Sequence, residues 1–517
     1  MPEPPAFLVD LRAAVAVLER IVAERALLAQ VPLADQRRLL QAAGHVYAPD
    51  TTSRRQLVRA TSRRRKAERV EREEAARGRT GIRALRRQPV FTSPNVFPPT
   101  AAEAFTPEDV HDPDAPREPL DRQHCYVCKA SYTSLHHFYD QLCPPCAEFN
   151  FAKRTELADL RGTVALLTGG RVKIGYQAGL KLLRAGSHLI VTTRFPRDAA
   201  ARYAREPDFS AWAHRLELFG LDLRHTPSVE AFCQEMVATR DRLDFIVNNA
   251  CQTVRRPPAF YAHMMAAEQT TAAALPARAR ALLGQYEAWH GAHPAPEGLA
   301  SVGPAAFDRR LPSLAGMADA ALLSQLALLP DDHHVASHLF PTGRVDQDGQ
   351  QVDLRERNSW RMLMADVPSV ELLEVQLVNA VAPFILNARL KPLMLRTPGR
   401  AKHIVNVSAM EGQFYRNFKT TRHPHTNMAK AALNMMTRTA AADYQQDGIH
   451  MNAVDTGWVT DEDPAEIAAR KVEEHRFHPP LDIVDGAARI VDPIIDGVNS
   501  GAHIWGRFLK DFRPTDW

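Results

Sequence analysis

A short apolar run that leads into a glycine-rich turn limits the fold of this chain more than any other feature. Residues 163–167 read Thr-Val-Ala-Leu-Leu, and glycines follow at positions 169, 170 and 175. The run fits a buried strand, and we expect a helix at residues 176–185. A strand, a glycine turn and a helix N-terminus can hold a pyrophosphate, because backbone N–H groups and the helix dipole face the anion. We therefore predict an α/β fold with a Rossmann-type, doubly wound parallel sheet.

Further landmarks follow in the order that this fold requires. Residues 188–192 are apolar and end in Thr193-Arg194, Asp222 follows a third apolar segment, and Asn248-Asn249-Ala250 closes a fourth. With the glycine turn, these landmarks resemble the short-chain dehydrogenase/reductase family over about half of the chain. One departure is Cys251, which stands where that family has a glycine.

The resemblance implies a nicotinamide dinucleotide site made of Thr168, Gly169, Gly170, Lys173, Ile174, Gly175, Arg194, Asp222, Asn249 and Lys430. Lys173 replaces the usual middle glycine of the turn, and a cation there can contact the phosphates. Arg194 replaces the acidic residue that would bind a ribose 2′-OH, and a guanidinium can pair with a 2′-phosphate. NADP is therefore favoured as the cofactor, with NAD as the alternative.

The proton-transfer residues of the family are only partly present. The family uses an Asn, a Ser, a Tyr and a Lys together, and Asn379 and Lys430 resemble the first and the last of these. Ser408 directly precedes the usual serine position, which holds Ala409, and Thr426 stands at the tyrosine position, one helical turn before Lys430. An aliphatic hydroxyl is a far weaker acid than a phenol of pKa about 10, so Thr426 is not an equivalent proton donor.

Two nearby side chains are candidates for a substitute acid, namely Tyr415 and His425. They support the first hypothesis, an NAD(P)-dependent oxidoreductase that acts on an unknown carbonyl or alcohol with a non-standard proton relay. The alternative is a catalytically inactive NADP-binding regulatory or scaffold protein that binds partners through its other regions.

An insertion that the family normally lacks occupies about residues 252–360. It follows the fourth strand, and the substrate crevice of such a sheet lies at the carboxyl ends of the strands. A lid over that crevice and a surface that binds other proteins both agree with this position.

Four of the six cysteines form two pairs, Cys125/Cys128 and Cys143/Cys146. Pairs with this spacing place four thiolates around one Zn²⁺, as in zinc ribbons. Because four thiolates complete the coordination shell, we predict a structural metal and a small zinc-ribbon-like module at residues 121–155.

The remaining regions complete the predicted domain order. Residues 1–87 are a helical and basic N-terminal region, residues 88–120 a proline-rich linker, and residues 156–517 the dehydrogenase domain with its insertion. Residues 51–89 carry fourteen basic and four acidic side chains but no aromatics. A solvated charged helix is therefore favoured over a nucleic-acid-binding arm.

The overall composition, with 45% hydrophobic and 24% charged residues, is typical of an ordinary soluble protein. No apolar run reaches eighteen residues, and the N-terminus lacks the pattern of a signal peptide. We expect a cytoplasmic protein with a small-molecule substrate and no membrane partner. Whether it forms a homo-oligomer stays open.

Overall fold

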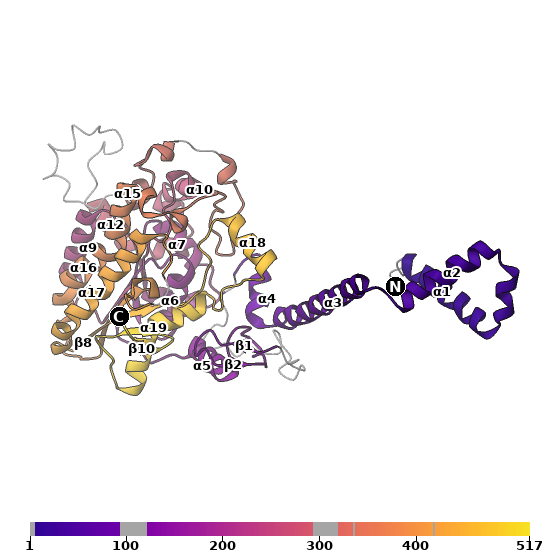
Figure 1. Cartoon of the computed structure of the whole chain (residues 1–517). Coiled ribbons are helices and arrows are strands. Elements are labelled where there is room, and N and C mark those ends of the chain that lie inside the picture. The colour runs from indigo at the N-terminus through magenta and orange to yellow at the C-terminus, as the bar shows by residue number, and fades with distance from the viewer. Residues whose placement is uncertain (1–5, 92, 94–120, 293–318, 334–336, 417–418) are drawn as a thin grey trace. The chain divides into compact units, whose positions relative to one another are not determined.

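The computed structural model describes residues 6–91, 93, 121–292, 319–333, 337–416 and 419–517 (Figure 1). The chain divides into two compact units, Met1–Ala76 and Arg77–Trp517. Most of the predicted linker at 88–120 and residues 293–318 of the predicted insertion lie outside the described residues.

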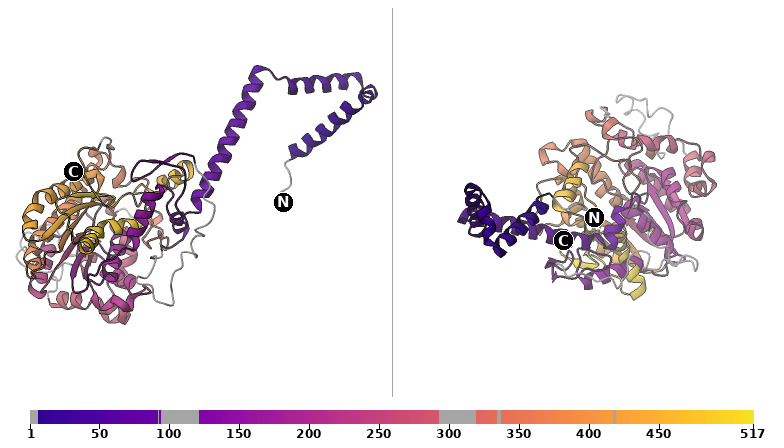
Figure 2. Two further views of the ribbon diagram at one scale, coloured as in Figure 1. Left: turned by 90° about the horizontal axis from the view of Figure 1, so that it is seen from below. Right: turned by 90° about the vertical axis from the view of Figure 1, so that its right-hand side faces the viewer.

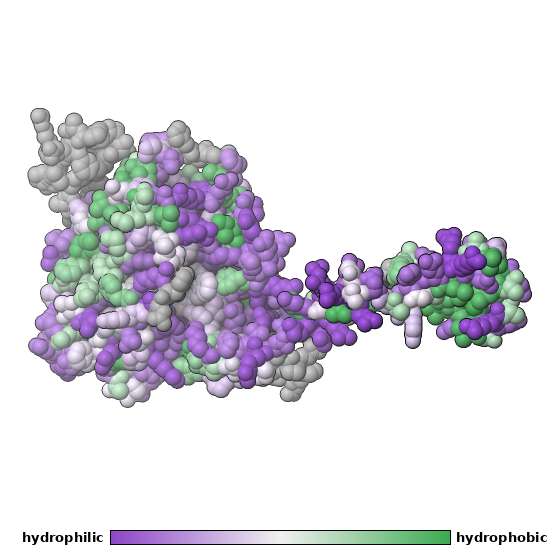
Figure 3. Space-filling model, viewed as in Figure 1, coloured by the Kyte–Doolittle hydropathy of each residue, from purple (hydrophilic) through white to green (hydrophobic). Residues whose placement is uncertain are grey.

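The first unit is helical, as predicted. It contains α1 (Ala6–Ala23), a 3₁₀ turn at Arg25–Gln30, α2 (Leu33–Tyr47) and most of α3 (Thr51–Gly78). No described residue of these helices is buried. The space-filling view shows apolar side chains on the surface of this unit (Figure 3). Phe7 and Val22 of α1 are among its exposed apolar residues.

The second unit is built around an eight-stranded sheet with the order β10-β9-β8-β7-β6-β3-β4-β5. Figure 2 shows strands of this sheet with helices beside them from two directions. All neighbours pair in parallel except β10, which is antiparallel to β9. The strands are β3 (Val164–Thr168), β4 (His188–Thr193), β5 (Leu216–Gly220), β6 (Phe245–Asn248), β7 (Lys402–Ser408), β8 (Ile449–Asp455), β9 (Phe508–Lys510) and β10 (Arg513–Thr515). The chain proceeds from β3 in one direction to β5 and then returns to β6 on the other side of β3. This reversal is a topological switch point, where doubly wound sheets bind ligands at the carboxyl ends of their strands.

Helices cover both faces of the sheet, as its nearly continuous apolar strands require. On one face α6 packs against α19, and on the other α9 packs against α16 while α17 lies along β7 and β8 (Figure 1). The helices of this unit are α4 (Gly81–Arg87), α5 (Pro144–Thr155), α6 (Lys173–Arg184), α7 (Pro196–Tyr203), α8 (Phe209–Trp212), α9 (Thr226–Thr239), α10 (Pro258–Glu268), α11 (Ala277–Ala281), α12 (Gly284–Ala292), α14 (Ala320–Leu323), α15 (Ser369–Gln376), α16 (Ala382–Met394), α17 (Pro424–Gln446), α18 (Ala465–His475) and α19 (Ile483–Ser500).

A π-helical turn, Leu377–Val381, joins α15 to α16 and contains the buried Asn379. Such turns add a residue to a helix and occur frequently at functional sites. Among the described residues, the segment Ser369–Met394 is the one helix that is long and apolar enough to cross a membrane by length and composition. In this molecule 44% of its most apolar window is buried, and a core helix meets the same criterion.

The four-cysteine region is a small module within the second unit. It consists of a two-stranded antiparallel sheet, β1 (Gln123–His124) and β2 (Ser131–Tyr132), followed by α5. Helix α4 packs with this module, since Ile82 shares its apolar core and Arg83 forms a buried 2.5 Å ion pair with Asp140. Helix α4, which lies at the end of the predicted N-terminal helical region (residues 1–87), therefore belongs to the second unit.

Candidate functional site

The glycine turn between β3 and α6 depends on its lack of side chains. A Cβ at Gly175 would lie 2.2 Å from the carbonyl oxygen of Gly169, and Gly169 itself has a φ of +70°. Asn249 then ties β6 to the turn, because its Nδ2 donates to the carbonyl oxygens of Thr168 and Gly169 at 3.1 Å. The Thr168 hydroxyl accepts a hydrogen bond from the N–H of Ala250.

Lys173 begins α6 in the left-handed backbone conformation that glycine favours, with a φ of 55°. It therefore keeps the shape of the glycine that it replaces and adds a positive charge. Burial disfavours this charge, but the carboxylates of Glu462, Asp348 and Asp346 outweigh the burial and raise the pKa of Lys173.

A cavity of about 570 Å³ opens beside this turn, and we call it the larger cavity. Of the residues predicted to hold a dinucleotide, its walls include Gly169, Lys173, Ile174, Gly175, Arg194, Asp222 and Asn249. Thr168, Gly170 and Lys430 are not in its walls, although the first two belong to the turn. The volume lies within the range of about 300–1,000 Å³ that is typical of small-molecule and cofactor sites.

Two guanidinium groups line the larger cavity near the ends of β3 and β4. Arg194 donates to the hydroxyl of Tyr261 at 2.7 Å and lies over that ring. Burial raises the pKa of this phenol, but Arg194 and its neighbours outweigh the burial and lower it. Arg171 forms a 2.7 Å ion pair with Asp198 and donates to Gln350.

Asp222 lies where the sequence predicts an acidic cofactor contact, and it already has a partner. Its carboxylate is 2% exposed and pairs with Arg224 at 2.6 Å. Burial raises the pKa of Asp222, but the pairing outweighs it and lowers the pKa.

The described part of the insertion forms one wall of the larger cavity. Residues 350–353, together with Asp346, Arg355 and Asn358, face the glycine turn across it. A buried bidentate ion pair at 2.7 Å joins Arg255 to Asp332, and Arg255 also contacts Glu374 of α15 at 2.8 Å. The insertion is thus attached to the sheet domain at the site itself.

The four residues at the proton-transfer positions are all buried, and none of them lines the larger cavity. Lys430 donates to the carbonyl oxygen of Val407 at 2.7 Å, and Asn379 exchanges two hydrogen bonds with the backbone of Gln252. The hydroxyls of Ser408 and Thr426 have no hydrogen-bond partner among the described residues. Buried hydroxyls normally have partners, so these two have unused hydrogen-bonding capacity inside the protein.

The structure separates the two candidate acids. Tyr415 is 83% exposed, so it does not join the buried residues, whereas His425 is 2% exposed. The Nε2 atom of His425 lies 3.3 Å from Oε1 of Glu371, which is also buried. The two atoms are close enough for an ion pair, but their alignment does not satisfy hydrogen-bond geometry. The contact is therefore electrostatic. Burial raises the pKa of Glu371, but His425 and Ser359 outweigh it and lower the pKa.

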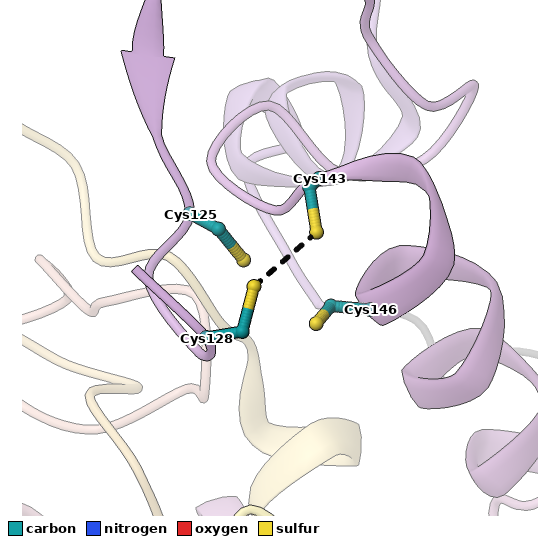
Figure 4. A group of neighbouring side chains, drawn as sticks. All are labelled: Cys125, Cys128, Cys143 and Cys146. Atoms are coloured by element: carbon teal, nitrogen blue, oxygen red, sulfur yellow. Dashed lines mark hydrogen bonds between the residues drawn. The ribbon is translucent and has the colours of Figure 1, made fainter. Parts of the chain in front are cut away.

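The four cysteines converge as their spacing predicts (Figure 4). Their sulfur atoms all lie within 4.8 Å of one another, and those of Cys128 and Cys143 are 3.6 Å apart. A tetrahedral Zn²⁺ with bonds of about 2.3 Å needs sulfurs separated by about 3.8 Å, so the arrangement fits this ion. A hydrogen bond from the N–H of Ala130 lowers the pKa of the Cys128 thiol to about 7, which favours the thiolate.

The cysteine module is fastened to the segment that follows β8. The hydroxyl of Tyr126 accepts a hydrogen bond from the N–H of Trp458, and Tyr139 donates to the buried Asp485 at 2.5 Å. The apolar core of the module also includes Val459, and Ile174 of the glycine turn packs against it. Because Thr460 and Glu462 of the same segment line the larger cavity, the module supports the wall of that cavity.

Several residues of the site were missed in the sequence. Arg171 lies inside the glycine turn, so its position in the motif could have identified it. Glu371 and Glu462 lie outside every motif, and only the fold brings them to His425 and Lys173.

Comparison with known proteins agrees with this geometry. Residues 163–273 match the short chain dehydrogenase family, and residues 358–480 match the family described as enoyl-(acyl carrier protein) reductase. The chain is therefore similar to the short-chain dehydrogenase/reductase family in two segments, and residues 274–357, which make up most of the insertion, lie between them.

Individual relatives match the chain to different extents. An uncharacterized protein, R665, of Acanthamoeba polyphaga mimivirus is 27% identical over 405 residues, covering 75% of this chain and 74% of that protein. Dehydrogenase/reductase SDR family member 13 of Bos taurus is 30% identical over 118 residues, which cover 22% of this chain and 29% of that protein. The crystal structure of a short chain dehydrogenase from Burkholderia cenocepacia in complex with NADP is 17% identical, with a TM-score of 0.40, covering 68% of this chain and 96% of that one.

Proposed function

We propose that the protein is an NADP-dependent oxidoreductase that interconverts a carbonyl compound and an alcohol. The observation that carries this proposal is the larger cavity, which lies at the topological switch point and contains the glycine turn, Asn249 and the guanidinium of Arg194. The nicotinamide cofactor, when bound, supplies or accepts the hydride. The turn N–H groups and Lys173 would hold its phosphates, and Arg194 with Arg171 would favour the 2′-phosphate of NADP.

His425 is the proposed proton donor and acceptor in place of the family's tyrosine. It is adjacent to Thr426 at the start of α17, and the carboxylate of Glu371, 3.3 Å from its Nε2, would hold the ring in place. Imidazole changes its charge near neutral pH, which suits proton transfer in both directions. Ser408 and Thr426 would position the substrate oxygen through their unpartnered hydroxyls.

Zn²⁺ is the proposed metal of the four-cysteine module. Four cysteine ligands complete its coordination shell and leave no position for a substrate. Its role is therefore structural, and it holds the module against the segment that lines the larger cavity.

One specific observation favours the alternative, a protein that binds NADP without turnover. All four proton-transfer positions are buried and lie outside the walls of the larger cavity. In that case the cysteine module, the basic helix α3 and the exposed apolar side chains of α1 would bind protein or nucleic-acid partners.

Calorimetric titration of the full chain with NADP and NAD, followed by turnover assays on a panel of carbonyls and alcohols, tests both functions. We expect the wild-type protein to bind NADP more tightly than NAD. In Arg194→Gln, NADP affinity should fall about tenfold while NAD affinity changes little.

His425→Ala should lower turnover by about a hundredfold or more without changing NADP affinity. Tyr415→Phe, which alters an exposed side chain, is the matched control. NADP binding with no turnover by the wild-type protein would favour the alternative.

A further inference from the structure

A second cavity of about 250 Å³ lies at the N-terminal end of α17, and we call it the smaller cavity. Its walls come from the end of the insertion, the loop between β7 and α17, the first turns of α17 and the segment after β8.

The smaller cavity has more basic than acidic side chains. Arg361, Arg416, Lys419 and Arg422 face two carboxylates, Glu411 and Asp463. Positive charges in excess around a cavity attract an anion, and the low dielectric of its walls strengthens that attraction.

Both carboxylates already have partners. Glu411 forms a 2.5 Å ion pair with Arg416, while Asp463 pairs with Lys471 at 2.5 Å and with Arg361 at 3.4 Å. Asp463 is thus shared between two cations, which leaves Arg361 incompletely neutralised.

The other two cations have no carboxylate partner among the described residues. Lys419 donates to the backbone carbonyl of Glu411, and no ion pair involves the guanidinium of Arg422. Burial lowers the pKa of Lys419, and a bound anion would relieve that cost.

The wall between these charges is rigid and aromatic. The rings of Trp360 and His423 stack with centroids 3.8 Å apart and an angle of 5° between their planes. The N–H of His423 donates to the carbonyl oxygen of Met362, and its Nδ1 lies 3.1 Å from Oδ1 of Asn427. These contacts fix the end of the insertion against α17, so the basic side chains surround a preformed space.

The position of the smaller cavity connects it with the proposed reaction. His423 and Asn427 flank His425 and Thr426 on the same helix, and Asp463 lines both cavities. Because Asp463 lines both cavities, a molecule held in the smaller cavity would lie beside the larger one. The volume of the smaller cavity is below the range of about 300–1,000 Å³ for complete ligand sites, so it suits one group of a larger substrate.

We propose that the smaller cavity binds an anionic group of the substrate, either a carboxylate or a phosphoryl group. Arg422 and Arg361 would contact its oxygens, since guanidinium groups bind such oxygens in pairs. The substrate is thus a carbonyl compound or alcohol with an anionic group remote from the reacting carbon. This assignment rests on the proposed function only in taking the bound anion to be part of a substrate.

Calorimetric titration of the full-length protein with inorganic phosphate and with succinate, at fixed ionic strength, tests the proposal. The titration is repeated with NADP present, so that phosphate bound in the larger cavity is displaced. Arg422→Gln and Arg361→Gln each remove one cation, and circular dichroism verifies their folding. Arg438→Gln is the matched control, because Arg438 is exposed on α17 beyond the cavity walls.

We expect at least one probe to bind the wild-type protein, and each of the two variants to weaken that binding about tenfold or more. Arg438→Gln should bind the probe as the wild type does, and NADP affinity should be the same in all four proteins. Binding of phosphate alone indicates a phosphoryl group, and binding of succinate alone a carboxylate.

Failure of both probes to bind, or binding that both cavity variants leave unchanged, would overturn the proposal. A probe that binds and is weakened by the variants, in a protein that binds no NADP, would support the anion site while refuting the proposed oxidoreductase function.

Discussion

The lining of the larger cavity and the proton-transfer positions depart from the family pattern in different ways. Lys173 replaces a glycine of the turn but keeps the left-handed backbone that a glycine would adopt. Thr426 replaces the tyrosine and supplies no comparable acid. A binding turn that works through its backbone keeps its shape when a side chain is added. A proton-transfer site that depends on one acidic side chain loses its acid when that side chain is replaced.

The largest expected effect comes from a substitution that distorts the backbone of the glycine turn. In Gly175→Ala, the new Cβ would meet the carbonyl oxygen of Gly169 at 2.2 Å, so the turn must open. We expect NADP affinity to fall by about a hundredfold, because the phosphates lose their backbone donors. Calorimetric titration measures the effect, and Gly399→Ala is the control because nothing lies within 4 Å of its Cβ. Unchanged affinity in Gly175→Ala would contradict the assignment of the turn.

The next largest effect should come from the metal module, which supports the same cavity from outside. Cys143→Ser removes one sulfur of the four, so we expect loss of bound zinc, a lower melting temperature and a decrease of about tenfold in NADP affinity. Metal analysis and thermal unfolding measure these changes. Cys233→Ala removes a buried thiol outside the cluster and should keep its zinc. A metal-free wild-type protein with full NADP affinity would refute the support role.

Among the proton-transfer residues, the substitution Glu371→Gln tests the contact between Glu371 and His425. It removes the carboxylate that lies 3.3 Å from His425 while keeping its size. We expect turnover to fall about tenfold and the acidic limb of the pH–rate profile to move, with unchanged NADP affinity. Glu473→Gln, on the exposed side of α18, serves as the control. If the pH–rate profile does not move, Glu371 has only a structural role.

The last expected effect is on stability rather than on binding or turnover, and it concerns Asp455, which is paired in register with Ser408 at the end of β7 and β8. Burial raises the pKa of this carboxyl from 3.8 to about 6. Its folded pKa is above its unfolded pKa, so its contribution to stability is complete below about pH 4 and is lost as the pH rises through 6. The wild type should therefore lose about 1–3 kcal/mol relative to Asp455→Asn between pH 4 and pH 7. Melting temperatures of both proteins across this range measure the difference, and a constant difference would contradict the raised pKa.

Local patterns in the sequence were sufficient for the elements that depend on near neighbours. The apolar run, the glycine turn and the helix after it are confirmed, although the helix begins at Lys173, earlier than expected. The cysteine pairs converge as predicted, because one pair lies on the turn between β1 and β2 and the other at the start of α5, and each is held together by local backbone structure.

Contacts between distant segments could not be predicted in this way. Glu371 meets His425 only because α15 packs against α17, and neither residue belongs to a motif that names the other. The same holds for the insertion, whose sequence agreed equally with a lid and with a binding surface. Its attachment at the larger cavity depends on ion pairs such as Arg255–Glu374, which join the insertion to a helix more than a hundred residues further along the chain.

The sequence by itself determined the type of sheet, the glycine turn and the four metal-ligand candidates, because each is set by residue type and short-range spacing. The tertiary structure alone decided that Tyr415 faces solvent, that His425 is buried beside a carboxylate, and that the cysteine module supports the wall of the larger cavity. Burial and long-range ion pairing arise only when separate elements pack together, and the free energy of a buried charge depends on the partners that this packing supplies.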